Sequence, residues 1–156
     1  MRKDIVNEII EKTPGISYNE IARKSGLSNG VISHHLIKLM ENGNVEKEGT
    51  IRGKYFLKNV PKKDRVKITI LRNKTNNEIF KILMKGFNNG EIITQNEISK
   101  KIKKSASTIS ISLKDLHKNG IVERVIMNKS VNLSNDIGYR IANGKLSARD
   151  MIKYNL

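Results

Sequence analysis

An internal repeat constrains this chain more than any other feature of its sequence. When the chain is shifted against itself by 77 positions, residues 16–47 align with residues 93–124 without a gap, and 14 of the 32 aligned pairs are identical. The identical pairs include Glu20 with Glu97, Ser28 with Ser105, Ile32 with Ile109, Leu36 with Leu113 and Gly43 with Gly120. A compositional bias toward Ile, Lys and Asn does not bring Glu, Ser, Leu and Gly into register. Two copies of one structural unit are therefore expected.

Each copy begins with helical patterns. Apolar residues recur at helical spacing over residues 5–10 in the first copy and over residues 79–84 in the second. The second of these segments starts with Thr75-x-x-Glu78, which predicts a capping box, because a hydroxyl and a carboxylate satisfy free N–H groups at a helix start. Ser17-x-x-Glu20 and Thr94-x-x-Glu97 repeat the device inside the aligned blocks. Each copy is thus expected to open with one helix and to continue with a second, shorter one.

A third helix follows a tight turn in each copy. It is expected to begin at Ser28 in the first copy and at Ser105 in the second. It is expected to end at Asn42-Gly43 and at Asn119-Gly120, because this dipeptide is typical of helix C-termini.

A hairpin of two short strands completes the pattern. Residues 45–57 contain two short strand-like runs around a tip flanked by Gly49 and Gly53, which predicts a strand on each side of the tip. In the second copy the strands are expected over residues 121–133, with a turn at Asn128-Lys129. The order helix, helix, turn, helix, hairpin is therefore expected twice.

The repeat also sets the expected domain boundaries. Domain 1 is expected at residues 1–58 and domain 2, with a C-terminal helical extension, at residues 75–156. Residues 59–74 form a basic linker, in which the alternating Val66, Ile68 and Ile70 indicate partial packing. The 17 residues from Lys58 to Lys74 reach at most ~56–61 Å when extended.

The end of the sequence predicts one more helix. Ser147-x-x-Asp150 is a cap signal ahead of the apolar residues Met151, Ile152 and Leu156. These apolar residues leave homodimerisation open.

The charge of the chain favours a polyanionic partner. Thirty Lys and Arg against fifteen Asp and Glu give a net charge of +15. Both halves contribute, since residues 1–78 carry 16 − 9 = +7 and residues 79–156 carry 14 − 6 = +8. A balance of this kind suits nucleic acid. No stretch approaches the ~20 apolar residues of a membrane span, so a cytoplasmic protein without a membrane partner is expected.

Part of the first copy resembles a known family. The stretch from Ile21 to Leu39, which contains Ile32-Ser33-His34-His35-Leu36, and the hairpin residues from Arg52 to Leu57 resemble the ArsR-like and MarR-like winged-helix regulators of bacteria and archaea. The resemblance is weaker in the second copy. It implies an α+β, mainly α fold of two tandem winged helix-turn-helix domains, each with three helices plus a β-hairpin wing. It also implies a recognition helix in the major groove of DNA and a wing on the backbone or minor groove.

The recognition helices supply the candidate DNA contacts. With Ile32 at the centre of the inward face, steps of 100° place Leu36 and Leu39 beside it and turn the polar residues outward. Ser and His hydrogen-bond base edges or phosphates, Gly permits close approach, and Arg or Lys on a hairpin clamps phosphate or enters the minor groove. The candidates in the first copy are Ser28, Asn29, Gly30, Ser33, His34 and Lys38, with Arg52 and Lys54 in the wing. Those in the second copy are Lys100, Lys101, Lys103, Lys104, Ser105, Ser107, Thr108, Ser110 and Lys114.

Other interpretations of these residues stay open. The outward residues also fit an ordinary solvated helix face, and exposed Ile111 and acidic Asp115 suit DNA contact poorly. His34 and His35 suit half a metal site or a pH sensor, although no third ligand stands at convincing spacing. The chain has no Cys, which excludes disulfides and thiolate metal sites, including the metal-sensing cysteines of ArsR-like relatives. No catalytic constellation stands out, so neither an enzyme nor a cofactor is expected.

Three functions are compatible with the sequence. The first is a sequence-specific regulator of transcription that binds double-stranded DNA and represses by steric exclusion. The second is a plasmid or viral replication initiator that binds origin repeats. The third is a tandem winged-helix scaffold that binds proteins and not DNA. No effector is indicated by the sequence.

Overall fold

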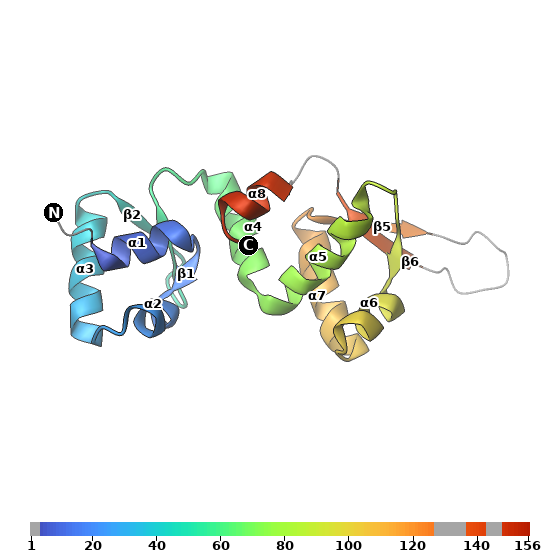
Figure 1. The fold of residues 1–156 in the computed structure, drawn as a ribbon, viewed down its shortest axis with the longest axis horizontal. Coiled ribbons are helices and arrows are strands. Elements are labelled where there is room, and N and C mark those ends of the chain that lie inside the picture. The colour runs from blue at the N-terminus through green and yellow to red at the C-terminus, as the bar shows by residue number, and fades with distance from the viewer. Residues whose placement is uncertain (1–3, 127–136, 143–147) are drawn as a thin grey trace. The chain divides into compact units, whose positions relative to one another are not determined.

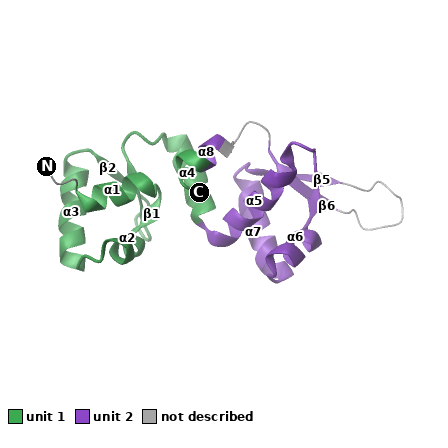
Figure 2. Ribbon diagram, in the orientation of Figure 1, with its two compact units in different colours: residues 1–72, 152–156 green, residues 73–151 purple. Residues whose placement is uncertain are grey.

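The chain forms two units. The computed structural model describes residues 4–126, 137–142 and 148–156 of the 156-residue sequence (Figure 1). Unit 1 contains residues 1–72 together with residues 152–156, and unit 2 contains residues 73–151 (Figure 2). The C-terminal residues thus belong with the N-terminal unit.

Unit 1 has the expected order of elements and one helix more. The elements are α1 (Ile5–Lys12), β1 (Ile16–Ser17), α2 (Tyr18–Ser25), α3 (Asn29–Glu41), β2 (Val45–Glu48), β3 (Lys54–Leu57) and α4 (Lys62–Arg72). The strands form an antiparallel sheet in the order β1-β3-β2, in which Ile16 lies opposite Tyr55 and Val45 lies opposite Leu57. Three helices, a short strand and a hairpin make this unit a winged helix-turn-helix fold.

Unit 2 repeats the arrangement. Its elements are α5 (Lys74–Phe87), β4 (Ile93–Thr94), α6 (Gln95–Ile102), α7 (Ala106–Lys118), β5 (Val122–Ile126) and β6 (Ile137–Ile141). The sheet order β4-β6-β5 matches that of unit 1, and Ile93 lies opposite Tyr139 as Ile16 lies opposite Tyr55. The α+β, mainly α fold of two tandem winged helix-turn-helix domains is therefore confirmed.

The repeat in the sequence is a repeat of the core. Ile21, Ile32, Leu36, Leu39 and Val45 are all buried in unit 1. Their partners 77 positions later are buried in unit 2 as well: Ile98, Ile109, Leu113, Leu116 and Val122. Burial of a Leu or Ile side chain stabilises a fold by about 1.5–3 kcal/mol. The same apolar positions therefore hold α2 and α3, and likewise α6 and α7, against their sheets.

The helix starts agree with the sequence at most places. Ser17 caps α2 by accepting a hydrogen bond from the Glu20 amide, and Thr94 caps α6 by accepting one from the Glu97 amide. The prediction of a capping box at Thr75-x-x-Glu78 is wrong. Asn73 caps α5 instead, and its side chain accepts a hydrogen bond from the amide of Asn76.

Residues 59–74, expected to be a basic linker, contain helix α4. The helix begins just after Pro61, whose carbonyl accepts hydrogen bonds from the amides of Asp64 and Arg65. Ile68 and Leu71, three residues apart on one face, are each 1% exposed, whereas Val66 is 56% exposed. The buried residues of this segment thus follow a helical period and not the expected alternation. The reach of ~56–61 Å assumed an extended chain and does not apply to a helix.

The last residues of the chain complete a second small core in unit 1. Tyr154 is 5% exposed and packs with Phe56, Val60 and Ile68. Its hydroxyl donates a hydrogen bond of 2.7 Å to Asp64 Oδ2 in α4. A residue near the C-terminus therefore contributes to the core around α4.

Arg72 fixes the backbone of this C-terminal segment. Its guanidinium donates hydrogen bonds to the carbonyl oxygens of Pro14 at 2.8 Å, Tyr154 at 2.6 Å and Asn155 at 2.8 Å. Asn155 in turn donates to the Lys12 carbonyl at 2.6 Å. These hydrogen bonds join the end of α4 and the loop after α1 to the last residues of the chain.

Two expectations at the end of the chain have mixed outcomes. The turn at Asn128-Lys129 lies outside the described residues, and the partner of β5 is β6, Ile137–Ile141. Helix α8 (Ala148–Lys153) is present where Ser147-x-x-Asp150 predicted one, although Ser147 itself is outside the described residues. Met151 is 6% exposed, whereas Ile152 is 79% exposed. Among residues 4–126, 137–142 and 148–156, no helix is long and apolar enough to cross a membrane.

Candidate nucleic-acid interface

The start of α3 is fixed by a side chain from α2. Tyr18 Oη donates a hydrogen bond of 2.8 Å to the carbonyl oxygen of Asn29, in the first turn of α3. Gln95, which stands 77 positions later, donates from Nε2 to the carbonyl oxygen of Ala106 at 2.9 Å in unit 2. Both units thus use the first residue of the second helix to position the helix that follows. Sequence reasoning missed this pair, because Tyr and Gln share no obvious chemistry in an alignment.

The outer face of α3 carries the candidates of the first copy. Ser28, Asn29, Gly30, His34 and Lys38 are exposed, whereas Ile32, Leu36 and Leu39 are buried beneath them. The face is not wholly polar, because Ile37 is 53% exposed. Gly30 has nothing within 4 Å of the position that a Cβ would take, so close approach by a partner is unobstructed. The face offers hydrogen-bonding groups and one Lys on a solvent-accessible helix.

Ser33 occupies a different position from its neighbours. Its hydroxyl lies 3.0 Å from Tyr18 Oη and is half-buried. Tyr18 has one hydroxyl hydrogen and gives it to Asn29, so Ser33 donates to Tyr18 in this arrangement. The oxygen of Ser33 keeps acceptor capacity, but its hydrogen is committed within the unit.

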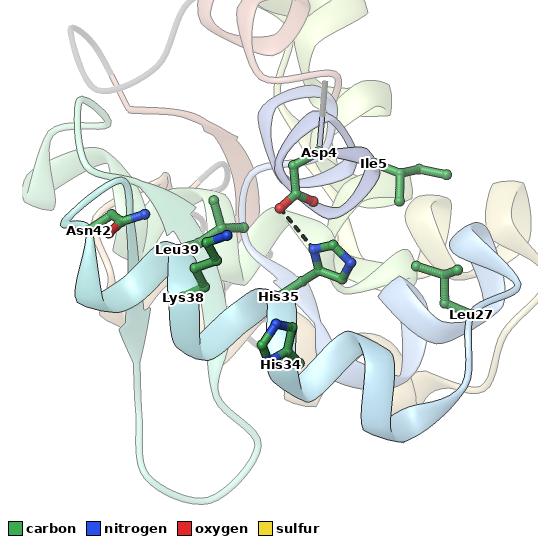
Figure 3. A pocket seen from close by; sticks show the side chains of 8 residues that line it. All are labelled: Asp4, Ile5, Leu27, His34, His35, Lys38, Leu39 and Asn42. Atoms are coloured by element: carbon green, nitrogen blue, oxygen red, sulfur yellow. Dashed lines mark hydrogen bonds and ion pairs between the residues drawn. The ribbon is translucent and has the colours of Figure 1, made fainter. Parts of the chain in front are cut away.

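His34 and His35 point to different surroundings. His35 Nδ1 lies 3.0 Å from Asp4 Oδ2, and the other Asp4 oxygen caps α1 by accepting from the amides of Val6 and Asn7 (Figure 3). His34 lies on the outer side with Lys38, one helical turn away. His34 and His35 both line a hollow of about 540 Å³, and Ile5 and Leu27 also belong to its lining.

The interpretation of His34 and His35 as half a metal site finds no third ligand in the part of the chain that the structure describes. There, no group of three or more His, Cys, Asp or Glu side chains stands together as metal ligands would. The ring centroids of His34 and His35 lie 6.1 Å apart. Asp4 joins the start of α1 to α3 through His35 and leaves His34 free to face outward.

The wing of unit 1 places its charges on two faces. Glu46 and Glu48 of β2 both accept hydrogen bonds from Nη1 of Arg65, at 3.0 Å and 2.7 Å. Arg65 is 3% exposed, and its guanidinium carbon lies 5.5 Å from the centre of the Phe56 ring. The hydrogen bond from Arg65 holds the pKa of Glu46 below its ordinary value. A buried Arg from α4 thus neutralises the two carboxylates of the strand.

The two wing candidates are not equivalent. Arg52 is exposed at the tip, with a φ of 37°. Lys54 lies opposite Glu48 in the strand register and is half-buried, so it shares a face of the sheet with that carboxylate. Lys47 lies opposite Tyr55, on the other face, which packs against α3. Sequence reasoning did not single out Lys47, although its alternation with Glu46 and Glu48 was a usable signal.

Unit 2 brings its candidates together at the start of α7. Ser105 caps the helix by accepting from the Thr108 amide, and its hydroxyl lies within 3.2 Å of that of Ser107 and 2.9 Å of that of Thr108. Lys100, Lys101 and Lys103 are exposed ahead of this helix. Lys104 is not free in this way, because its Nζ donates a hydrogen bond of 2.6 Å to Thr75 Oγ1 and lies 3.9 Å from Glu78 Oε2. Ser110 is half-buried and Lys114 is exposed.

Arg65 and Asp4 are further residues that sequence reasoning missed. Arg65 lay in a segment expected to be a linker, where a buried cation had no predicted carboxylate partner. Asp4 precedes the first apolar residue of α1, and an Asp at that place is a recognised N-cap signal that could have been found. Its contact with His35 joins residues 31 positions apart and has no local signature.

The fold and the exposed third helix of each unit define a class, the winged helix-turn-helix proteins. A family model described as an N-terminal helix-turn-helix domain matches residues 1–68, and a family model of winged helix-turn-helix DNA-binding domains matches residues 72–123. The chain therefore carries two helix-turn-helix domains in tandem. No curated protein matches it in sequence.

Several solved structures resemble the chain at low identity. Reduced HlyU from Vibrio cholerae is 17% identical, with a TM-score of 0.47, over 60% of this chain and 86% of that one. A conserved hypothetical protein from Chlorobium tepidum is 10% identical, with a TM-score of 0.35, over 97% of this chain and 94% of that one. ScpB from Mycobacterium tuberculosis is 10% identical, with a TM-score of 0.33, over 91% and 94%.

Proposed function

We propose that the protein is a sequence-specific regulator of transcription that binds double-stranded DNA. The observation that carries the proposal is the solvent-exposed outer face of α3, with Gly30, His34 and Lys38 on a helix whose inner face is fixed by Leu36 and Leu39. A helix of this kind fits the major groove, where side chains reach base edges. The domain class and the net charge of +15 support the same partner.

The contacts divide into reading and positioning roles. His34 and Lys38 lie where base edges would meet α3, and Ser33 adds an acceptor whose orientation is set by Tyr18. Arg52 at the wing tip and the exposed Lys100, Lys101 and Lys103 ahead of α7 supply phosphate contacts. Repression would follow from steric exclusion of the transcription machinery. Two DNA-binding units on one chain also raise the local concentration of the second once the first is bound.

The test begins with recovery of DNA fragments that the purified protein binds. Affinity for a recovered duplex and for a scrambled duplex is then measured over a range of salt concentrations. Log affinity should fall with log salt by about 0.9 for each phosphate contact. Absent or salt-insensitive binding would contradict the proposal and favour a protein-binding scaffold. Fragments that map to origin repeats instead of promoters would favour a replication initiator.

Four variants test the division of roles. Ser33→Ala and His34→Ala should reduce the preference for the recovered duplex over the scrambled one. Arg52→Ala and Lys101→Ala should weaken binding to both duplexes about equally. Equal losses from all four variants would contradict the assignment of reading roles to α3.

A further inference from the structure

Unit 2 contains a cationic hollow between α7 and the sheet. The hollow has a volume of about 230 Å³, and its polar lining includes Gln95, Ser110, Lys114, His117, Arg124 and Tyr139. Lys114 and His117 come from one side of α7, and Arg124 comes from β5, where it lies opposite Tyr139. Side chains from a helix and a strand thus place three basic groups around one small space.

The basic groups of this hollow are weakly engaged within the protein. Over the described ranges of the chain, the side chains of Lys114 and Arg124 form no hydrogen bond or ion pair, and both residues are exposed. His117 Nδ1 lies 3.4 Å from the carbonyl oxygen of Val122, so this nitrogen carries a hydrogen and Nε2 is left without a protein partner there.

The nearby carboxylates are engaged elsewhere. Glu123 alternates with Arg124 along β5 and accepts a hydrogen bond of 3.0 Å from Arg140. Asp115 accepts from the side chain of Asn76 at 3.1 Å. Neither carboxylate lines the hollow. Lys114 and Arg124 therefore make the hollow positively charged and able to donate hydrogen bonds, which is the chemistry that recognises a phosphate group.

Unit 1 lacks this chemistry at the matching positions. Ile37 stands where unit 2 has Lys114, and Met40 stands where it has His117; only Lys47 keeps the charge of Arg124. Ile37 is 53% exposed and Met40 is 36% exposed.

On the other flank of the helix the difference is reversed. Unit 1 carries His34 and Lys38 there, whereas unit 2 carries Ile111 and Asp115 at the same positions. The two units therefore present their basic groups on opposite flanks of equivalent helices.

We propose that the hollow of unit 2 binds a phosphodiester group of the DNA backbone. Unit 2 is then held on DNA by the wing side of α7, whereas unit 1 uses the flank of α3 that carries His34 and Lys38. This inference rests on the proposed function and adds the way in which unit 2 contacts DNA. It also accounts for exposed Ile111 and acidic Asp115, which lie away from the phosphate.

The test uses full-length Lys114→Gln and Arg124→Gln variants. Each should weaken binding to a recovered duplex about tenfold and lower the slope of log affinity against log salt by about 0.9. The matched control is Lys81→Gln, which removes the same charge from an exposed position of α5 and should leave affinity and slope unchanged. All three residues are exposed, so equal midpoints of thermal unfolding will show that folding is intact.

A second arm identifies the source of the phosphate. Wild-type protein without DNA is titrated with inorganic phosphate at constant ionic strength while the His117 ring is followed by NMR. Weak binding, together with variants that lose DNA affinity, supports the backbone as the source. Tight binding of free phosphate, with DNA affinity unchanged in both variants, would overturn the proposal in favour of a phosphorylated small molecule.

Two outcomes separate a failure of this inference from a failure of the proposed function. If wild-type protein binds duplex in a salt-dependent way but both variants bind like the wild type, the hollow is not a DNA site and only this inference fails. If wild-type protein binds no duplex at all, the proposed function fails as well.

Discussion

The hydroxyls of Tyr18 and Ser33 lie 3.0 Å apart and join α2 to α3. Because Tyr18 also donates to the carbonyl oxygen of Asn29, one phenol holds two consecutive turns of α3. In unit 2, Gln95 performs the first of these contacts with Ala106. The orientation of the third helix of each unit therefore depends on a residue in the preceding helix.

Replacing Tyr18 with Phe should loosen the start of α3 without opening a cavity. Each neutral hydrogen bond contributes about 1 kcal/mol, so a loss of about 1–2 kcal/mol in the stability of unit 1 is expected. Hydrogen exchange should accelerate at the amides of the first two turns of α3 and not at those of α7. Gln95→Leu is the matched variant and should affect α7 alone. Unchanged exchange in α3 would show that Tyr18 does not fix this helix.

Gly26 and Lys103 occupy the same place in the repeat and share a left-handed backbone. Gly26 ends α2 with a φ of 67°, and Lys103 ends α6 with a φ of 61°. A side chain in this region costs about 1–2 kcal/mol. Lys103→Gly should therefore stabilise unit 2 by about 1 kcal/mol, and Gly26→Ala should destabilise unit 1 by a similar amount. Chemical denaturation measures both changes, and a loss of stability in Lys103→Gly would contradict the conformational argument.

The contact between Glu46 and Arg65 predicts a pH dependence of stability. The Arg65 hydrogen bond keeps the pKa of Glu46 below its ordinary value in the folded state. A lowered pKa stabilises the fold above the ordinary value of about 4.3 and loses this effect as the pH falls through the folded value. Wild-type protein should thus be more stable than Glu46→Gln at pH 7, and the difference should shrink below about pH 4.3. A difference that grows on acidification would refute the assignment.

Tyr154 should stabilise unit 1 although it lies near the C-terminus. Tyr154→Ala removes a buried ring from the cluster with Phe56, Val60 and Ile68, and such a truncation costs about 3–5 kcal/mol. Tyr154→Phe loses the hydrogen bond to Asp64 and keeps the ring, so a smaller loss is expected. Thermal unfolding of the full chain measures both. Equal stability of Tyr154→Ala and wild type would contradict the place of the C-terminal residues in unit 1.

The repeat predicted the core because identical apolar positions do the same packing in each unit. Ile32 and Ile109 are buried at corresponding places. Ser17 and Thr94 each cap a helix by accepting a hydrogen bond from an amide three residues later in the sequence. These are local or periodic relations, which sequence patterns express directly. The same reasoning failed at Thr75, because Asn73 offers a competing cap two residues earlier.

Long-range contacts were not predictable in this way. Tyr154 donates to Asp64 across 90 residues, and Arg65 turns an expected linker into part of unit 1. The candidate site was predicted as a face of α3, because a helical wheel separates inward from outward residues. The restraint on Ser33 and the hydrogen bond of Lys104 could not be seen from the sequence. The first depends on how α2 meets α3, and the second on how the turn before α7 meets α5.

The most direct test of the central claim is to map which helix lies against DNA. The sequence has no Cys, so a single cysteine can carry a DNA-cleaving chelate at a chosen position. His34→Cys places the chelate on the outer face of α3, and Glu11→Cys places it on an exposed position of α1 as the control. We predict strong cleavage within the bound site from position 34 and little from position 11. Cleavage from position 11 but not from position 34, with binding retained in both variants, would contradict the claim that α3 enters the groove.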